Sequence, residues 1–259
     1  MKIKVFTAFS GYDSQCMALD MVKENHPDFN YELVGWSEID KYACQMHDVF
    51  YPQWSERNYG DISKIDWVEV PDFDLFTFSF PCQSISNAGL QHGFAEGSGT
   101  RSSLLWECKK AIDIKRPKIL LMENVKALVQ KKFMPDFQRW LDYLESKGYT
   151  NYWQVTNAKD YGIPQNRERV FCVSLLDDSR NYVFPSPIKL DKCLKDMLDP
   201  EEMIPESYYL PQAKVDEFVK MNEKKLSEAM ASDSPQPAST ESANACEGGV
   251  TEVTATRNG

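Results

Sequence analysis

The 259-residue sequence predicts an α/β fold with a mostly parallel central sheet and helices on both faces. Short runs rich in Val, Ile, Phe and Tyr alternate with amphipathic stretches over residues 1–185, which is the pattern of repeated βαβ units. Gly, Pro, Asp or Asn bounds most of these runs. The run Leu75–Phe80 has large apolar side chains at four of its six positions, on both alternating sets, as expected of a central strand covered on both faces.

The apolar runs predict strands, which in chain order are Ile3–Phe9, Leu33–Trp36, Leu75–Phe80, Ile119–Met122, Tyr152–Thr156 and Val170–Leu176. Apolar residues at helical spacing predict helices between them, at Ser14–Glu24, Asp40–Phe50, Ser102–Ile114 and Met134–Ser146. The second helix follows an acidic residue that suits a helix start, and Lys147-Gly148 provides a stop signal for the last.

The composition predicts three segments. Residues 1–185 form one α/β domain, and residues 186–230 form a Pro-punctuated connector followed by an amphipathic helix. Residues 231–259 are mostly Ser, Thr, Ala, Pro, Glu and Gly without an aromatic residue, which predicts a disordered tail. The helix carries an apolar stripe, which either packs on the chain's own core, the favoured interpretation, or docks a second chain: Val215, Phe218, Val219 and Leu226.

The charge balance excludes one class of function. Lys and Arg number 29 against 39 Asp and Glu, and the net charge of −10 argues against a protein that coats nucleic acid by bulk electrostatics. The net charge of −10 remains compatible with an enzyme that has a local basic groove.

No apolar run reaches membrane-spanning length, and the N-terminus lacks a secretory pattern. The 7 cysteines are spread out without a C-x-x-C pair, which predicts a reducing cytoplasm and no metal site.

Polar residues follow several predicted strands, at the sheet edge where open α/β sheets bind ligands. Phe9–Tyr12 contains a glycine that lets backbone approach a ligand, although the segment also suits a tight turn that caps the next helix. Glu38 and Asp40 follow the second strand, where an acidic residue either binds ribose hydroxyls or caps a helix. Gly60–Ile62 is a similar acidic turn. Together these turns predict a nucleoside-containing cofactor.

Reactive residues follow the other strands. Cys82 lies in a turn just after a buried strand, where backbone amides can favour a thiolate, although most cysteines are simply small buried residues. Glu123 ends another apolar strand. Alternation predicts that Gln165, Arg167 and Arg169, in the segment just before the last strand, share one face, where arginines suit either phosphate or oxyanion contacts or salt bridges.

These motifs, in this order, resemble those of cytosine-5 DNA methyltransferases: Phe9-Ser10-Gly11, Pro81-Cys82-Gln83, Glu123-Asn124-Val125 and Gln165-x-Arg167-x-Arg169. The resemblance covers residues 1 to about 176 and implies a Rossmann-like, S-adenosylmethionine-dependent methyltransferase fold. It implies methyl transfer to C5 of a cytosine flipped out of double-stranded DNA. A tRNA cytosine-5 methyltransferase shares these motifs and is an alternative, as is an impaired relative that binds S-adenosylmethionine without turnover.

The resemblance also implies roles for individual residues. Cys82 would add to C6 of the base, and Glu123 would hydrogen-bond N3 and the exocyclic amine. Arg169 would support the flipped base, and Arg167 would help to hold the Cys82 loop. The residues implied for cofactor binding are Phe9, Ser10, Gly11, Tyr12, Glu38, Ile39, Asp61, Ile62, Pro81 and Leu104.

The sequence departs from the family pattern in three places. Asp13 stands where a second glycine is usual, and Ile39 stands where an aromatic residue often stacks on adenine. After Arg169 we find neither the family's target-recognition region nor its closing segment, and Gly248-Gly249-Val250 is a poor match for the latter. The departures favour either the catalytic part of a split enzyme, with a second chain that supplies target recognition, or the impaired relative.

Overall fold

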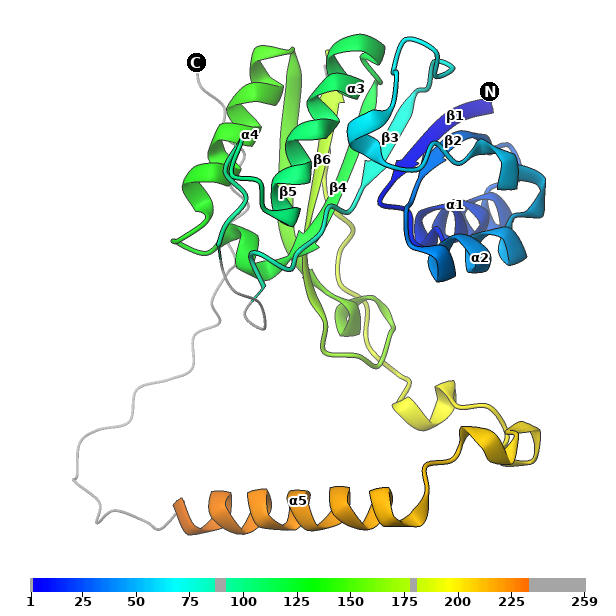
Figure 1. Cartoon of the computed structure of the whole chain (residues 1–259), viewed down its shortest axis with the longest axis vertical. Coiled ribbons are helices and arrows are strands. Elements are labelled where there is room, and N and C mark those ends of the chain that lie inside the picture. The colour runs from blue at the N-terminus through cyan, green and yellow to red at the C-terminus, as the bar shows by residue number, and fades with distance from the viewer. Residues whose placement is uncertain (1, 87–91, 178–180, 233–259) are drawn as a thin grey trace. The chain divides into compact units, whose positions relative to one another are not determined.

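A computed structural model describes residues 2–86, 92–177 and 181–232 (Figure 1). The chain divides into two units, one that ends at Asp191 and one that begins at Lys192, and each is described by itself. Within the described residues, no helix has the length and apolar character needed to cross a membrane. The predicted disordered tail lies outside the described residues from residue 233 onward.

The first unit is built on a six-stranded sheet with the order β2-β1-β3-β4-β6-β5. β1 pairs in parallel with β2 and β3, and β3 pairs in parallel with β4, whereas β6 runs antiparallel to both β4 and β5. The mostly parallel sheet is therefore confirmed, and each predicted strand is present. The strands are β1 (Lys2–Ala8), β2 (Asn30–Ser37), β3 (Leu75–Phe78), β4 (Ile119–Val125), β5 (Tyr149–Asn157) and β6 (Glu168–Leu176).

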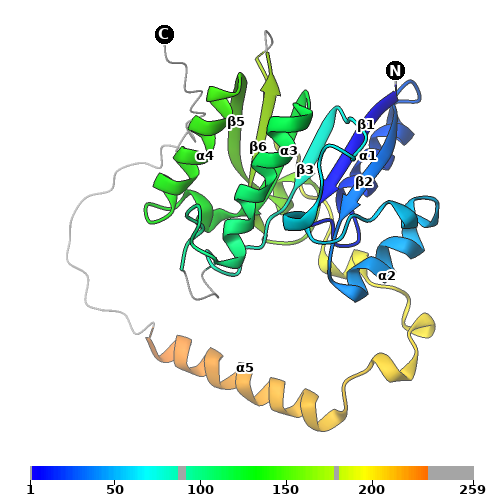
Figure 2. The same ribbon diagram turned by 45° about the horizontal axis from the view of Figure 1, so that its top comes forward.

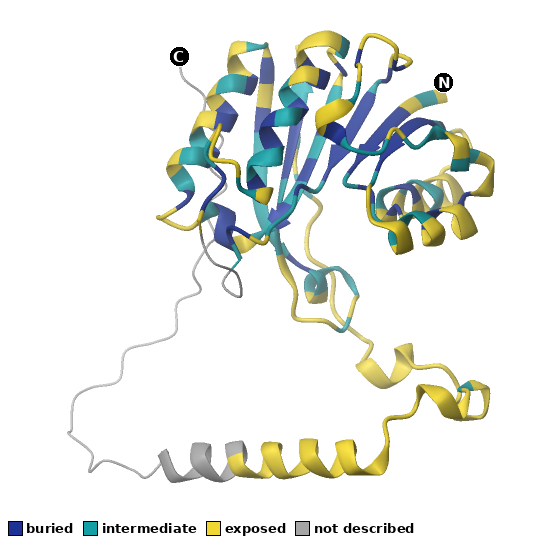
Figure 3. Ribbon diagram, viewed as in Figure 1, coloured by how far each residue is buried: buried dark blue, intermediate teal, exposed yellow. Residues whose placement is uncertain are grey.

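Helices cover both faces of this sheet, as Figures 1 and 2 show. On one face, Phe76 and Met122 pack with Trp140 of α4 in a large apolar cluster. On the other, Leu33 packs with Cys16 of α1. Figure 3 shows the buried strands between the partly exposed helices. The α-helices of this unit are α1 (Ser14–Asn25), α2 (Lys41–Phe50), α3 (Cys108–Lys115) and α4 (Met134–Ser146).

The predicted helix at Ser102–Ile114 differs from expectation. Its first half is a 3-10 helix, η3 (Arg101–Glu107), and only the second half is the α-helix α3. The Ser103 hydroxyl donates to the Thr100 carbonyl, a local bond of the kind that competes with α-helical pairing. The other short 3-10 helices of this unit are η1 (Pro52–Arg57), η2 (Ile62–Lys64), η4 (Lys126–Val129) and η5 (Ala158–Tyr161).

The second unit contains α5 (Gln212–Ser232), which spans the predicted amphipathic stretch. Val215, Phe218 and Val219 follow helical spacing along one side of it, as the sequence pattern requires. Three short 3-10 helices precede it: η6 (Leu194–Met197), η7 (Glu201–Met203) and η8 (Glu206–Tyr208).

The topology brings the polar motifs to one edge of the sheet. Because β1, β2, β3 and β4 are parallel, the segments that follow them leave from the same edge. β6 runs the opposite way, so its first residues lie at this edge as well, where Arg169 is paired with Val125 at the end of β4. Residues more than 80 positions apart in the sequence, from Cys82 to Arg169, thereby reach one location.

Candidate active site

Cys82 lies in a tight turn that follows β3. The strand ends at Phe78, and the backbone amides of Ile85 and Ser86 donate to the Cys82 carbonyl at 3.0 and 2.8 Å. The side chain is half-buried. The turn fixes the backbone of Cys82 and leaves its thiol at the edge of the sheet.

Two buried side chains anchor this turn from other elements. The Ser102 hydroxyl of η3 accepts from the Ser84 amide at 3.1 Å and donates to the Pro81 carbonyl. The Asn124 amide of β4 donates to the Phe80 carbonyl at 2.9 Å. Both anchors are almost completely buried, so they are protected from competition with water. The turn is held on both sides of Cys82.

The buried cysteines of this unit have a different environment. Burial raises the pKa values of the Cys16 and Cys108 thiols and raises that of Cys172 to about 12. These three side chains are therefore neutral thiols in the core. Cys82 instead lines a cavity, together with charged side chains.

This cavity, which we call the cysteine cavity, has a volume of about 240 Å³. It brings together the four predicted catalytic residues, Cys82, Glu123, Arg167 and Arg169. Arg169 Nε lies 3.0 Å from Glu123 Oε1, and both side chains are about three-quarters buried. The Ser79 hydroxyl donates to Glu123 Oε2 at 2.6 Å. Each oxygen of the Glu123 carboxylate thus has a partner.

The predicted placement of Gln165 is wrong. β6 begins at Glu168, and Gln165 lies in the turn before it, where its amide donates to the Ile163 carbonyl at 2.7 Å. Strand alternation therefore does not apply to Gln165. Arg167 and Arg169 both reach the cysteine cavity, whereas Glu168 forms an ion pair with Lys126 at 2.8 Å.

A second cavity, which we call the acidic cavity, has a volume of about 270 Å³. Ser79 and Pro81 line both cavities, so the two are separated only by the segment that leads from β3 to Cys82. The predicted cofactor residues that line the acidic cavity are Phe9, Glu38, Ile39, Asp61, Ile62, Pro81 and Leu104.

The two carboxylates of the acidic cavity are held by backbone amides. Glu38 accepts from the amide of Gly11 at 2.9 Å and from those of Ile39 and Asp40. Hydrogen bonds from the hydroxyl and the amide of Ser63 hold the pKa of Asp61 below its usual value. Asp61 therefore stays ionised near neutral pH and can accept hydrogen bonds from a ligand.

The three remaining predicted cofactor residues do not line the acidic cavity. Ser10 is buried and donates to the Thr7 carbonyl at 3.0 Å. Gly11 has a φ of +57° and binds Glu38 through its amide. Tyr12 is 49% exposed, with its ring 6.3 Å from that of Phe50. Cofactor contacts by these three residues stay a prediction.

Asp13 adopts the conformation that the family's usual glycine would allow. Its φ is +67°, in the left-handed region, and its side chain is fully buried. The carboxylate accepts from the Thr7 hydroxyl at 2.8 Å and caps α1 through the Cys16 amide at 3.2 Å. His47 Nε2 lies 3.6 Å away. The departure at Asp13 therefore preserves the turn through buried polar contacts.

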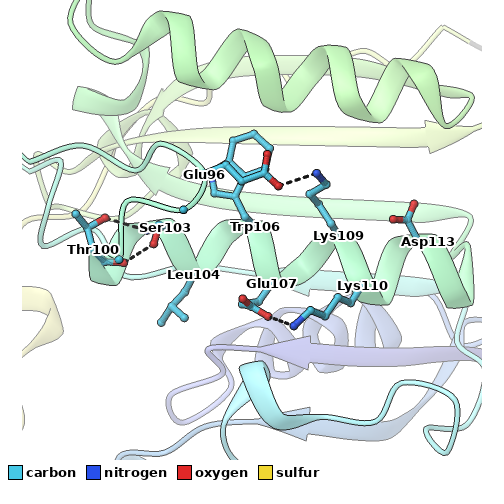
Figure 4. Close-up of a pocket in the computed structure, with 11 residues that line it drawn as sticks. Glu96, Thr100, Ser103, Leu104, Trp106, Glu107, Lys109, Lys110 and Asp113 are labelled. Atoms are coloured by element: carbon cyan, nitrogen blue, oxygen red, sulfur yellow. Dashed lines mark hydrogen bonds and ion pairs between the residues drawn. The ribbon is translucent and has the colours of Figure 1, made fainter.

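A larger cavity of about 570 Å³ runs along the outer side of η3 and α3 (Figure 4). Four of its charged side chains pair with each other, Lys109 with Glu96 at 2.8 Å and Lys110 with Glu107, and Asp113 pairs with Lys147 at 2.7 Å. Because these charges are matched locally, this cavity offers less to a charged ligand than the cysteine and acidic cavities. Within the part of the chain that the structure describes, no cluster of His, Cys, Asp and Glu has the arrangement of a metal site.

Sequence reasoning did not single out Ser79 or Ser102, and it named Asn124 only within a motif. Ser79 is one of two polar residues in the run Leu75–Phe80, which is the one local signal for it. Ser102 and Asn124 are buried polar residues, and their partners can be identified only in the folded chain.

Comparison with known proteins places these features in a family. Residues 3–254 match the family described as C-5 cytosine-specific DNA methylase, so the match extends beyond the first 176 residues that carry the motifs. The Type II methyltransferase M2.ScrFI of Lactococcus lactis subsp. cremoris is 42% identical over 82% of this chain and 71% of its own length. The Type II methyltransferase M.HaeII of Haemophilus aegyptius is 37% identical over 70% of this chain and 55% of its own length.

Solved structures share the fold. The methyltransferase EhMeth of Entamoeba histolytica superposes with a TM-score of 0.64 at 20% identity, over 82% of this chain and 63% of that structure. The Dnmt2 methyltransferase of S. pombe gives a TM-score of 0.55 at 17% identity, over 70% and 52%. The chain thus spans about half to two-thirds of the length of most of these proteins.

Proposed function

Because the chain belongs to the C-5 cytosine-specific DNA methylase family, we propose that it transfers a methyl group to C5 of cytosine in double-stranded DNA. The observation that carries the proposal is the pair of adjoining cavities. One holds Cys82 and Glu123, the other holds Glu38 and Asp61, and they share Ser79 and Pro81. Such a pair suits a reaction in which the base is bound in one cavity and a nucleoside cofactor in the adjoining one.

Cys82 supplies the nucleophile. Its sulfur forms a bond to C6 of the cytosine, which increases electron density at C5 and makes that carbon able to accept a methyl group. Once C5 carries the methyl group, loss of its proton re-forms the C5–C6 double bond, breaks the bond between sulfur and C6 and restores the thiolate. The anchors from Ser102 and Asn124 keep the sulfur at a fixed position during both steps.

Glu123 stabilises the base as Cys82 adds. Its carboxyl group lies in the same cavity as Cys82 and can hydrogen-bond N3 and the exocyclic amine of the base. These hydrogen bonds stabilise the charge that develops on the base while the sulfur adds to C6. Arg169, which lines the same cavity, orients Glu123 through an ion pair in which Nε lies 3.0 Å from Oε1. Arg167 lines the cavity with an exposed side chain and is placed to contact the base or its phosphate.

The acidic cavity fits S-adenosylmethionine, which supplies an electrophilic methyl group when bound. Glu38 and Asp61 would hold the cofactor by accepting hydrogen bonds from its ribose hydroxyls or amino groups. Phe9, Ile62 and Leu104 offer apolar surface to the adenine ring. Ile39 is 75% exposed and, without an aromatic ring, gives weaker stacking than the family's usual residue.

The substrate base must leave the helix to react. The cysteine cavity holds Cys82 and Glu123, and these side chains cannot reach C6 and N3 of a base that is stacked and paired inside a duplex, so we propose base flipping. We also propose that the protein acts in the cytoplasm, since the six described cysteines are free thiols.

We propose that target recognition comes from a further segment, carried by a second chain. In support, the chain matches 71% of M2.ScrFI and 55% of M.HaeII, so each relative has a part without a counterpart here. The apolar stripe of α5 is the candidate docking surface for that chain. Methylation that rises when host extract is added, and falls when Phe218→Asp is introduced, supports this arrangement.

Isotope transfer tests the reaction. With labelled S-adenosylmethionine and mixed-sequence duplex DNA, the protein is expected to produce 5-methylcytosine, identified after digestion to nucleosides. The assay is run with and without host extract, and tRNA replaces DNA in a parallel arm. Label in DNA supports the proposal, label in tRNA alone moves the activity to RNA, and absence of label under every condition contradicts a methyltransferase.

A further inference from the structure

Ser79 occupies a special place between the two cavities. Its side chain lines both of them, and its hydroxyl is the group that contacts the Glu123 carboxylate from the wall they share. The sequence motifs that identify the site do not include this residue. Resting on the proposed function, we propose that Ser79 is a positioning residue that fixes the Glu123 carboxylate for contact with the base.

The contact is short and strongly oriented. Ser79 Oγ lies 2.6 Å from Glu123 Oε2, the distance typical of a hydroxyl that donates to an ionised carboxylate. Arg169 Nε binds the other oxygen at 3.0 Å, so the two partners hold the carboxylate from two directions. A carboxylate held at both oxygens has lost the rotation about its last bond, which favours one orientation toward the cavity.

The backbone that carries Ser79 is itself fixed. The Ser79 amide donates to the Ala8 carbonyl of β1 at 3.4 Å, and the next carbonyl, that of Phe80, accepts from Asn124 at 2.9 Å. Glu123 and Asn124 are consecutive residues of β4. β4 therefore contacts the Ser79–Phe80 segment twice, once through each side chain, and the position of the hydroxyl is determined by the sheet.

A hydroxyl suits this role better than a second cation. Arg169 can only donate hydrogen bonds, whereas a serine hydroxyl both donates and accepts. Ser79 can therefore stay bonded to Glu123 whether its carboxyl group is ionised or shares a proton with N3 of the base. An orienting partner that survives both states keeps the geometry constant while the base reacts.

Four variants test the inference by steady-state methylation: Ser79→Ala, Ser79→Thr, Glu123→Gln and the double variant. Ser79→Ala is expected to lower kcat about tenfold or more, as for loss of a hydrogen bond to a charged group, with the KM for S-adenosylmethionine changed by less than about twofold. Ser79→Thr keeps the hydroxyl and is expected to recover most of the rate. Because Ser79 acts through Glu123, adding Ser79→Ala to Glu123→Gln is expected to change the rate by less than about twofold.

Ser146→Ala is the matched control, since that hydroxyl donates to the Tyr143 carbonyl at the end of α4, in another part of the unit. Wild-type rates in Ser79→Ala, a loss confined to KM for S-adenosylmethionine, or a full additional loss in the double variant would each overturn the inference.

A readout without turnover separates this inference from the proposed function. The carboxyl ¹³C resonance of Glu123, assigned by its loss in Glu123→Gln, is expected to move in Ser79→Ala and to stay in place in Ser146→Ala. An unchanged resonance in Ser79→Ala contradicts the positioning role even if the enzyme is active. A moved resonance in a protein that methylates nothing supports the contact and rejects the proposed function instead.

Discussion

At the scale of single residues, the polar groups of the site are held by neighbours that determine their chemistry. Glu123 lies between Ser79 and Arg169, and Asp61 lies against the hydroxyl and amide of Ser63. Each carboxylate is thus satisfied before a ligand arrives, and each keeps lone pairs for one. Such preorganisation lowers the free energy needed to order the site on binding.

Asp61 gives a prediction at this scale. Its carboxylate lines the acidic cavity and stays ionised because Ser63 holds its pKa below the usual value. Replacing it by Asn removes a charged acceptor, so Asp61→Asn is expected to weaken binding of S-adenosylmethionine about tenfold or more by calorimetry. Asp66→Asn is the matched control, because Asp66 also accepts from an amide two residues on but does not line the cavity. Equal affinity in the two variants would contradict the assignment of Asp61.

At the scale of elements, the turn after β3 is the critical piece. Its geometry depends on Ser102, which lies on η3 and bonds the chain on both sides of Cys82. That side chain is fully buried, so removing its hydroxyl leaves the Ser84 amide and the Pro81 carbonyl without this partner. The position of Cys82, the proposed nucleophile, is therefore determined by an element some 20 residues further along the chain.

Ser102→Ala tests this dependence. The variant is expected to lose about 1–3 kcal/mol of stability in denaturant unfolding, as for a buried polar group left unpaired, and to methylate DNA more slowly. Ser103→Ala is the neighbouring control, because the Ser103 hydroxyl bonds only within its own helix turn, to Thr100. If both variants unfold and react alike, Ser102 does not anchor the turn.

The elements also show how far sequence reasoning reaches. The spacing of apolar residues is a local property of the sequence. The six strands and α4 were therefore predictable from it, with differences of a few residues at their ends. The 3-10 geometry of η3 was missed, because apolar spacing does not register the serine side chains that bond the local backbone. Gln165 was misplaced because strand alternation was extended back into the turn that precedes β6.

The site was predictable where a reactive residue follows a strand, and not where a supporting contact joins distant segments. Cys82 and Glu123 stand at strand ends, and the parallel topology predicts that they meet. The contact from Ser79 to Glu123 joins residues 44 positions apart, and it depends on β3 and β4 being neighbours in register. No local pattern specifies that pairing, so the partner of Glu123 emerges only from the folded sheet.

At the scale of the whole molecule, the sheet order assembles the site. β3 and β4 bring Cys82 and Glu123 side by side, and antiparallel β6 enters from the same edge to add Arg169. Phe9 after β1, Glu38 after β2 and Asp61 at the start of η2 complete the adjoining cavity. With a net charge of −10, the chain has little general attraction for DNA, which agrees with the proposal that recognition is supplied elsewhere.

Covalent trapping tests the central claim most directly. A duplex that carries 5-fluorocytosine blocks the last step, because fluorine cannot leave C5 as a proton does, so the protein should remain bonded to DNA when S-adenosylmethionine is present. The account predicts a denaturation-resistant complex with the wild-type chain and with Cys193→Ala, whose thiol lies in the second unit, and none with Cys82→Ala. A complex that persists in Cys82→Ala, or that fails to form in the wild-type chain under conditions of active methylation, would contradict it.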